Sequence, residues 1–291
     1  MRRSAAVDGF ELAYDRVGAG PAVVLLHGWP GDRTDYRALV PLLASSTEVV
    51  VPDLRGFGES DKPAAAPVEQ YTAAAQARSV AGLIDELGLA RPVVVGYDVG
   101  SRTAQALAVA RPDLVGALVL APPLPGAGRR VLDPAATPEF WYQPFHRLPL
   151  AEQLIDGKPD AVRDYLAHFW SHWSGPDFTL DPADLEHLVS VYGPPGAFTA
   201  SINWYRAGAG TAAVALTEVA PEAGDRIGVP TAVLWPEHDP LFPRAWSDRL
   251  DEFFSDVTLQ PADGVGHFSP LEAPQLFATE VMAALDRGRP G

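Results

Sequence analysis

The stretch VVVGYDVGS, residues 93–101, decides the fold. Three consecutive β-branched residues favour a strand buried on both faces, and Gly96 follows them directly. Gly96 and Gly100 flank a turn with Asp98 at its tip, where a strained backbone and close neighbours favour glycine. This G-x-nucleophile-x-G pattern predicts an elbow between a strand and a helix, which lifts its central side chain above the edge of a sheet.

A carboxylate at the tip of this turn has two explanations. Asp98 stands at the start of a predicted helix, where an aspartate is often only a cap that accepts backbone N–H groups. As a nucleophile it would attack an sp³ carbon and displace an oxygen or a halide, leaving an alkyl ester for water to hydrolyse. The five-residue pattern does not separate these explanations, so the other strand ends must decide between them.

Similar apolar runs recur along the chain and alternate with candidate helices. Continuous runs of this kind are typical of strands in a parallel sheet that is covered on both faces. The runs lie at residues 22–26, 48–51, 92–95, 117–120, 231–235 and 257–260, and the helices at 36–43, 72–87, 101–110 and 274–287. The order of these elements predicts an α/β fold with a mostly parallel, doubly covered sheet.

The middle of the chain has a different character. From about residue 122 to residue 211 the buried-strand runs disappear, and Trp, Tyr, Phe, His and Pro become frequent. Helices are predicted there at residues 150–156, 160–173 and 181–192. We therefore expect a core made of residues 1–125 and 213–291, with a helical cap of residues 126–212 inserted between its two parts.

Further motifs follow the predicted strands. HGWPG, residues 27–31, comes after the first run, and such a turn supplies a backbone N–H, here that of Trp29, to an oxyanion. The N–H of Val99, next to the elbow residue, would be the second donor. WPEHDP, residues 235–240, and GVGHFSP, residues 264–270, add carboxylates and a histidine after later strands. Nucleophile, acid and histidine thus follow one another in the order typical of α/β-hydrolases.

The sequence resembles α/β-hydrolases of the epoxide hydrolase type over essentially its whole length. HGWPG, PDLRGFGESDKP, GYDVG, WPEHDP and GHFSPLEAP all fall in the order of that family. The resemblance implies an α/β-hydrolase fold in which Asp98 is the nucleophile and His267 activates the hydrolytic water. Its pattern favours Asp239 over Glu237 as the acidic partner of His267. Some relatives place this acid after an earlier strand, but residues 120–123, LAPP, offer no carboxylate there.

Two tyrosines are candidates for the general acid. Opening an epoxide creates an alkoxide that needs a proton, and a tyrosine stays protonated at neutral pH and donates through its O–H. Tyr142 in FWYQPFH and Tyr205 in NWYRA lie in segments that resemble the two cap motifs carrying the ring-opening tyrosines of epoxide hydrolases. The predicted reaction is therefore hydrolysis of an epoxide to a vicinal diol.

Dehalogenation is the main alternative, because it uses the same aspartate and histidine. Haloalkane dehalogenases place tryptophan directly after the nucleophile, and haloacetate dehalogenases place two arginines nearby. Here Val99 occupies the first position and only Arg102 matches an arginine, which an ion pair would also explain. The halide-binding His-Trp pair falls at Phe140 and Trp141, so Trp141 and Arg102 remain candidate substrate-binding residues. A non-catalytic binding protein with this fold is a minor alternative.

Composition narrows the partners. The 291 residues carry a net charge of −15 and no cysteine. The acidic balance argues against nucleic acid and anionic membranes, and the lack of cysteine excludes disulfides and thiolate chemistry. The histidines lack metal-like spacing, so we expect no metal and no cofactor, only a small epoxide and water. Without a signal peptide or a spanning run, we expect a cytoplasmic protein, and base rates favour a homodimer.

Overall fold

The protein is built around one eight-stranded sheet. The computed structural model describes residues 1–64 and 66–287. The strand order is β1-β2-β4-β3-β5-β6-β7-β8, and pairing is parallel from β4 onward, while β1 and β2 are antiparallel at one edge. The strands are β1 (Arg2–Arg3), β2 (Ala13–Gly18), β3 (Ala22–Leu26), β4 (Glu48–Pro52), β5 (Val93–Gly96), β6 (Ala117–Leu120), β7 (Thr231–Pro236) and β8 (Val257–Ala262). The predicted α/β fold with a mostly parallel sheet is confirmed.

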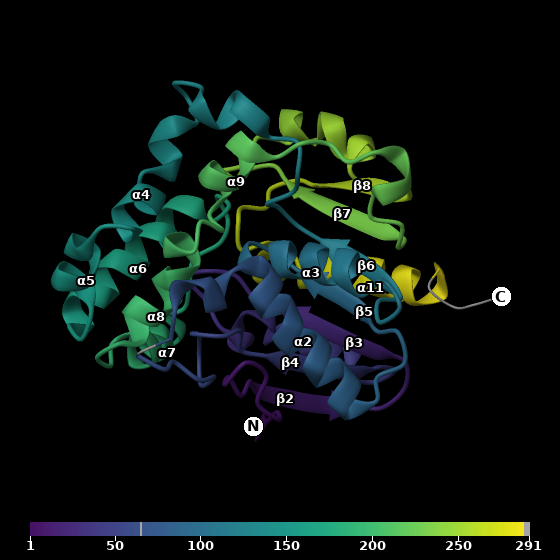
Figure 1. Cartoon of the computed structure of the whole chain (residues 1–291), viewed down its shortest axis with the longest axis horizontal. Coiled ribbons are helices and arrows are strands. Elements are labelled where there is room, and N and C mark those ends of the chain that lie inside the picture. Colours follow the sequence, from purple (N-terminus) through teal and green to yellow (C-terminus); the bar gives the residue numbers. More distant parts are fainter. Residues whose placement is uncertain (65, 288–291) are drawn as a thin grey trace.

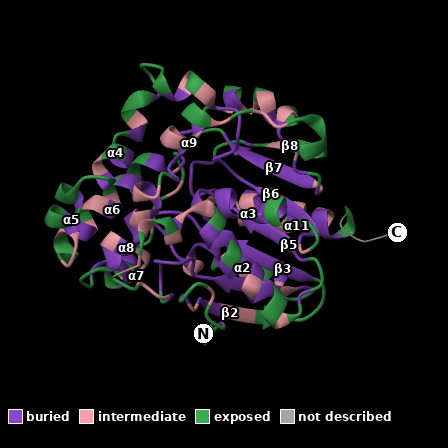
Figure 2. Cartoon of the chain, in the orientation of Figure 1, coloured by how far each residue is buried: buried purple, intermediate pink, exposed green. Residues whose placement is uncertain are grey.

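Helices cover both faces of the sheet. On one face α3 (Val99–Ala110) packs against β3 and β5, and α2 (Ala73–Leu87) packs against α3. On the other face α11 (Pro274–Arg287) contacts β5, β6 and β7, and α1 (Val40–Leu43) contacts α11 (Figure 1). Every residue of β3, β5, β6 and β7 is buried as a result (Figure 2). Burial on both faces is why these strands read as continuous apolar runs.

Two local expectations differ from the structure. The helix predicted at residues 36–43 is confirmed only over its second half, because the chain forms a short 3-10 helix η1 (Arg33–Tyr36) and α1 begins at Val40. Pro41 stands in the first turn of α1, and a proline there starts a helix but cannot continue one from the preceding turn. β1 and β2 were not predicted, because their residues are partly exposed and form no apolar run.

The chain between β6 and β7 is helical. Three of its helices begin and end within one residue of the predicted bounds, and the predicted end of the cap at residue 212 falls inside α9. The helices are η3 (Gly128–Leu132), η4 (Thr137–Phe140), α4 (Tyr142–His146), α5 (Pro149–Ile155), α6 (Pro159–Trp173), α7 (Pro182–Tyr192), α8 (Ala197–Arg206), α9 (Thr211–Thr217) and η5 (Ala223–Asp225). Figure 1 shows α4 to α8 gathered on one side of the molecule, beside the sheet.

Hydrogen bonds join this helical segment to the loop that follows β3. The indole Nε1–H of Trp170 donates to the Pro30 carbonyl at 3.1 Å, and the Tyr192 hydroxyl donates to the Gly31 carbonyl at 2.6 Å. The loop is therefore held by α6 and α7 as well as by the strand β3 that precedes it.

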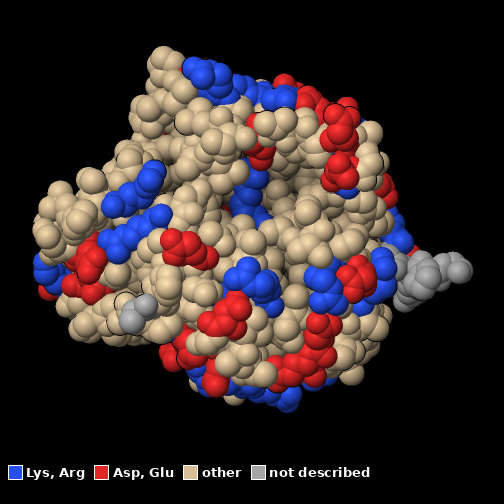
Figure 3. Space-filling model, viewed as in Figure 1, with Lys and Arg blue, Asp and Glu red and all other residues tan. Residues whose placement is uncertain are grey.

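The surface is mixed in charge. Figure 3 shows Lys and Arg side chains interspersed with Asp and Glu over the visible face. No helix in residues 1–64 and 66–287 combines the length and apolar character that crossing a membrane requires.

Candidate active site

The elbow after β5 is strained and closely packed. Asp98 has φ 48° and ψ −121°, in the half of conformational space that favours glycine, which costs about 1–3 kcal/mol. A Cβ on Gly96 would lie 2.5 Å from the backbone of Gly100, and one on Gly100 would lie 1.9 Å from the carbonyl oxygen of Leu26. Both glycines are thus required by close contacts. The Asp98 side chain makes no capping bond to α3, so the helix-cap explanation is excluded.

The two carboxylate oxygens of Asp98 have different partners. Oδ1 accepts a hydrogen bond from the backbone N–H of Trp29 at 2.7 Å, and Oδ2 lies 3.5 Å from Nε2 of His267. A Cβ on Gly28 would lie 2.6 Å from the Asp98 Cβ, so glycine permits this approach. The second predicted donor, Val99, begins α3, where an N–H has no acceptor within its own helix. No hydrogen bond joins it to Asp98 in the described part of the chain.

The structure brings His267 and Asp239 together. Nδ1 of His267 is 2.9 Å from Oδ2 of Asp239, whose other oxygen accepts the N–H of Leu241 at 2.9 Å. Both side chains are buried. Glu237, the other candidate, lies at the surface and accepts the N–H of Gly264 at 2.9 Å. Asp239 is therefore the carboxylate that orients the imidazole.

Two carboxylates govern the protonation of His267. Burial favours the neutral imidazole, but the charges of Asp239 and Asp98 outweigh burial and raise the pKa of His267 to about 10. Glu272 holds the loop around this histidine by accepting the N–H groups of Gly266 at 2.7 Å and Phe268 at 3.0 Å. A proton on His267 is held between the carboxylates of Asp239 and Asp98.

Tyr142 and Tyr205 meet above Asp98. Tyr142 begins α4 and Tyr205 lies near the end of α8, with their rings edge to face and centroids 5.5 Å apart. Tyr142, Tyr205 and Asp98 border one small cavity. The cavity has a volume of about 10 Å³, which holds about one water molecule. Burial, reinforced by the charge of Asp98, raises the pKa of both hydroxyls. Both therefore stay protonated at neutral pH and are available as donors.

Aromatic rings enclose this site. Trp29 stacks on Tyr142 with an angle of 4° between the rings and centroids 5.6 Å apart, and Trp173 lies 5.0 Å from the His267 ring. Only the backbone of Trp29 was predicted to belong to the site, and the role of its indole was not. Gln143 was not predicted either, although it borders the cavity and donates a hydrogen bond to the Tyr142 hydroxyl. The only signal for Gln143 was its place next to Tyr142.

The two predicted substrate-binding residues lie in different places. Arg102 is buried and borders the cavity, but its Nη1 is 3.2 Å from a carboxylate oxygen of Glu218 and its Nη2 donates to the Leu124 carbonyl. Trp141 is 43 % exposed and lines a surface groove of α4 to α6, away from Asp98. Trp141 therefore lines a different space from its neighbour Tyr142, which borders the cavity at Asp98.

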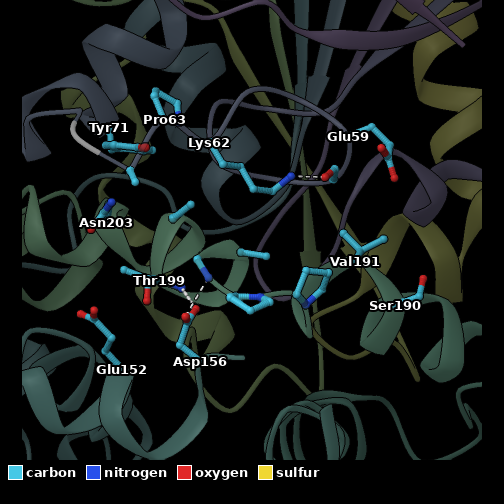
Figure 4. Close-up of a pocket in the computed structure, with 17 residues that line it drawn as sticks. Glu59, Lys62, Pro63, Tyr71, Glu152, Asp156, Ser190, Val191, Thr199 and Asn203 are labelled. Carbon is cyan, nitrogen blue, oxygen red and sulfur yellow. Dashed lines mark hydrogen bonds between the residues drawn. The ribbon is translucent and has the colours of Figure 1, made fainter. Parts of the chain in front are cut away.

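A larger cleft lies elsewhere. It is formed by the loop after β4 and by helices α5, α7 and α8, with a volume of about 410 Å³, and Figure 4 shows Lys62, Tyr71, Asp156 and Asn203 around it. Asp98 does not line it.

Within residues 1–64 and 66–287, no group of three or more His, Asp or Glu side chains is arranged to hold a metal ion.

Comparisons with known proteins agree with this architecture. The α/β hydrolase fold family matches residues 21–274. A soluble epoxide hydrolase of Corynebacterium sp. (strain C12) is 29% identical, covering 93% of this chain and 92% of that protein. A fluoroacetate dehalogenase of Burkholderia sp is 33% identical over 195 residues, which are 66% of this chain and 64% of that protein.

Solved structures are also similar. Epoxide hydrolase CorEH is 27% identical with a TM-score of 0.81, covering 99% of both chains. The protein ALR0039 of Nostoc sp PCC 7120 is 27% identical with a TM-score of 0.85, covering 98% of this chain and 97% of its own. Since the family match spans residues 21–274, which is most of the sequence, this chain belongs to the α/β hydrolase family.

Proposed function

We propose that the protein is an epoxide hydrolase that opens an epoxide to a vicinal diol through an alkyl ester of Asp98. One observation carries the proposal: Asp98, Tyr142 and Tyr205 border the same cavity, so a nucleophile and two protonated hydroxyls face one space. In this proposal residues 126–212 act as a cap that carries the two tyrosines over the core. The reaction uses only these side chains and water.

The first step forms the ester. Oδ1 of Asp98 is held by the Trp29 N–H, so Oδ2 is the oxygen that attacks an epoxide carbon. The carbon–oxygen bond of the ring breaks, and its electron pair stays on the leaving oxygen. A proton from Tyr142 or Tyr205 neutralises that oxygen, and general acid help of this kind contributes about 10²–10⁴-fold.

The second step hydrolyses the ester. Alkylation removes the negative charge of Asp98, so one of the two carboxylates that raise the His267 pKa is lost when a base is needed. His267, oriented by Asp239, then takes a proton from water, whose oxygen attacks the carboxyl carbon of Asp98. The oxyanion on Oδ1 is stabilised by the Trp29 N–H, and we assign the second donor to Val99. Collapse breaks the ester C–O bond, and the departing diol oxygen takes the proton of the added hydroxyl, which restores Asp98 as a carboxylate. The tyrosinate left by ring opening regains the proton that His267 took from water.

Fluoroacetate-type dehalogenation is the second candidate. The 33% identity with a fluoroacetate dehalogenase and the place of Arg102 beside the cavity favour it. However, Arg102 is engaged by Glu218, and Trp141 faces the outside. A carboxylate substrate would have to compete with Glu218 for the guanidinium, so epoxide opening is the better proposal.

A side-by-side assay tests the proposal. The protein is incubated with styrene oxide, an aliphatic epoxide, fluoroacetate and a bromoalkane, and diol and halide are measured. Diol formation without halide release supports epoxide hydrolysis. Halide release without diol would favour dehalogenation over epoxide hydrolysis. If neither diol nor halide forms, only a binding role remains.

A further inference from the structure

The carboxamide of Gln143 is buried, and both of its ends are hydrogen-bonded. Nε2 donates to the hydroxyl oxygen of Tyr142 at 3.1 Å, and Oε1 accepts the backbone N–H of Ala212 at 3.0 Å. A backbone N–H can only donate, so it identifies the end of the carboxamide that faces α9 as oxygen. The –NH₂ end therefore faces Tyr142.

We propose that Gln143 is a positioning residue that makes Tyr142 the principal proton donor of ring opening, an inference that rests on the proposed function. The Tyr142 oxygen accepts the Nε2–H of Gln143, so its own proton is directed away from Gln143 and toward the cavity. As that proton passes to the epoxide oxygen, negative charge develops on the phenol oxygen. A hydrogen bond to a charged acceptor is stronger than one to a neutral acceptor, so Gln143 stabilises the transition state more than the ground state.

The surrounding backbone is shaped for this carboxamide. Gly210 precedes α9, and a Cβ at that position would lie 2.7 Å from Oε1 of Gln143 and 3.0 Å from the ring of Tyr205. The missing side chain of Gly210 thus leaves room for both groups. Ala212, in the first turn of α9, holds the carboxamide from behind. Burial raises the pKa of Tyr142, and the bond from Gln143 acts in the opposite direction.

The two tyrosines differ in this respect. In the described part of the chain Tyr142 accepts a side-chain amide, whereas Tyr205 does not. Tyr205 lies against Tyr142. A hydrogen bond from the Tyr205 hydroxyl lowers the pKa of Tyr142, as the hydrogen bond from Gln143 also does. We assign the transferred proton to Tyr142, with Tyr205 binding the ring oxygen beside it.

A titration tests the hydrogen bond without requiring turnover. 2,3,5-Trifluorotyrosine, whose phenol is several pH units more acidic than that of tyrosine, is placed at position 142, and its ionisation is followed by fluorine NMR in the full-length protein. Gln143→Met removes the amide donor and should raise the pKa of this residue by about one pH unit. Gln143→Glu keeps the acceptor for Ala212 but loses the donor, so it should also raise the pKa of the residue at position 142. This variant replaces Gln143→Met in the test if the Met variant does not fold. An unchanged pKa in a folded variant overturns the proposal.

Gln76 provides a matched control. It is also buried, donates through Nε2 to the Arg55 carbonyl at 3.0 Å and accepts the Arg55 N–H at 2.8 Å. Gln76→Met therefore removes an equivalent amide whose partner is the Arg55 backbone and not a tyrosine. It should leave the titration at position 142 unchanged, and a shift equal to that of Gln143→Met would overturn the specific assignment.

Single-turnover kinetics test the catalytic consequence. Gln143→Met should slow formation of the alkyl enzyme about 10- to 100-fold and leave hydrolysis of the ester unchanged. In a Tyr142→Phe background the same change should have no further effect, because Gln143 acts through the lost hydroxyl. An equal loss in both backgrounds overturns the positioning role. If wild-type protein forms no alkyl enzyme from any epoxide, the proposed function fails, while the titration still decides whether Gln143 acts on Tyr142.

Discussion

The backbone N–H of Trp29 lies 2.7 Å from Oδ1 of Asp98 and so makes the two oxygens of that carboxylate inequivalent. Oδ1 occupies the position in which an oxyanion would be stabilised, and Oδ2 is left beside His267. This asymmetry separates the two halves of the proposed reaction, because one oxygen attacks the substrate and the other carries the charge during hydrolysis.

Replacing His267 should trap the alkyl enzyme. His267→Gln leaves Asp98 able to attack but removes the base for water, so the protein mass should rise by the mass of one epoxide. Mass spectrometry after incubation with styrene oxide measures this. Asp98→Asn in the same background is the control and should show no increase. Absence of any adduct in His267→Gln would contradict attack by Asp98.

Removing the charge of Asp98 should lower the pKa of His267. Burial opposes the raised value of about 10, and Asp239 and Asp98 together sustain it, so Asp98→Asn removes one of its two causes. NMR titration of the imidazole should show the decrease. The folded pKa exceeds the unfolded value of about 6.5, so the stability that the protonated His267 gains from the two carboxylates is complete below about pH 6.5. This stability is lost as pH rises toward 10, and the loss should be smaller in Asp98→Asn. An unchanged pKa would mean that Asp239 alone sets it.

The strands and the elbow could be predicted because the contacts that shape them leave a recognisable mark in a short stretch of sequence. Burial on both faces leaves an apolar run, and the close contact of Gly100 with Leu26 leaves a glycine. β2 could not be found this way, because it lies near the edge of the sheet and its residues range from buried to exposed.

The site was only partly predictable. Glu237 and Asp239 are two residues apart, and the residues alone did not show which one the turn after β7 directs at His267. Trp141 was proposed because it falls at the position of the halide-binding tryptophan of dehalogenases, and that match does not show that its side chain is exposed in a surface groove. The bond that anchors Gln143 joins it to a residue 69 positions later, and no local pattern announces such a contact.

Removing both hydroxyls at the cavity should slow ring opening. The double variant Tyr142→Phe, Tyr205→Phe should lose about 10²–10⁴-fold in alkyl-enzyme formation, measured by rapid quench, because both donors to the leaving oxygen are gone. Tyr165→Phe is the control: this tyrosine bonds His146 at 2.8 Å and should change the rate little. A double variant as fast as wild type would leave the epoxide proposal without its acid.

Adding one methyl group at the elbow should destabilise the whole core. A Cβ on Gly100 would lie 1.9 Å from the carbonyl oxygen of Leu26, a clash that only backbone movement relieves. Gly100→Ala should cost about 3 kcal/mol in the free energy of unfolding, measured by urea denaturation. Gly224→Ala, at an exposed position with nothing within 4 Å, should change it by about 0.5 kcal/mol or less. Equal stability of the two variants would show that the elbow relaxes without cost.

The contact between His187 and Asp32 should make the attachment of α7 depend on pH. Nε2 of His187 is 2.7 Å from the buried carboxylate of Asp32. The hydrogen bond to Asp32 raises the pKa of His187 above its usual value of about 6.5. This contact therefore stabilises the folded state fully below about pH 6.5, and its contribution falls as pH rises through the folded pKa. The imidazole is 37 % exposed, so solvent screening keeps the effect modest.

His187→Gln tests this contact. The difference in Tm between wild type and His187→Gln should be larger at about pH 6 than at about pH 9. His238→Gln is the control, because His238 lies at the surface 3.7 Å from the equally exposed Glu237 and contributes little at either pH. A difference that does not change with pH would show that His187 holds Asp32 as a neutral imidazole. In that case α7 is attached by a hydrogen bond rather than an ion pair, and the buried carboxylate draws its stabilisation from Thr34, whose N–H donates to it at 2.7 Å.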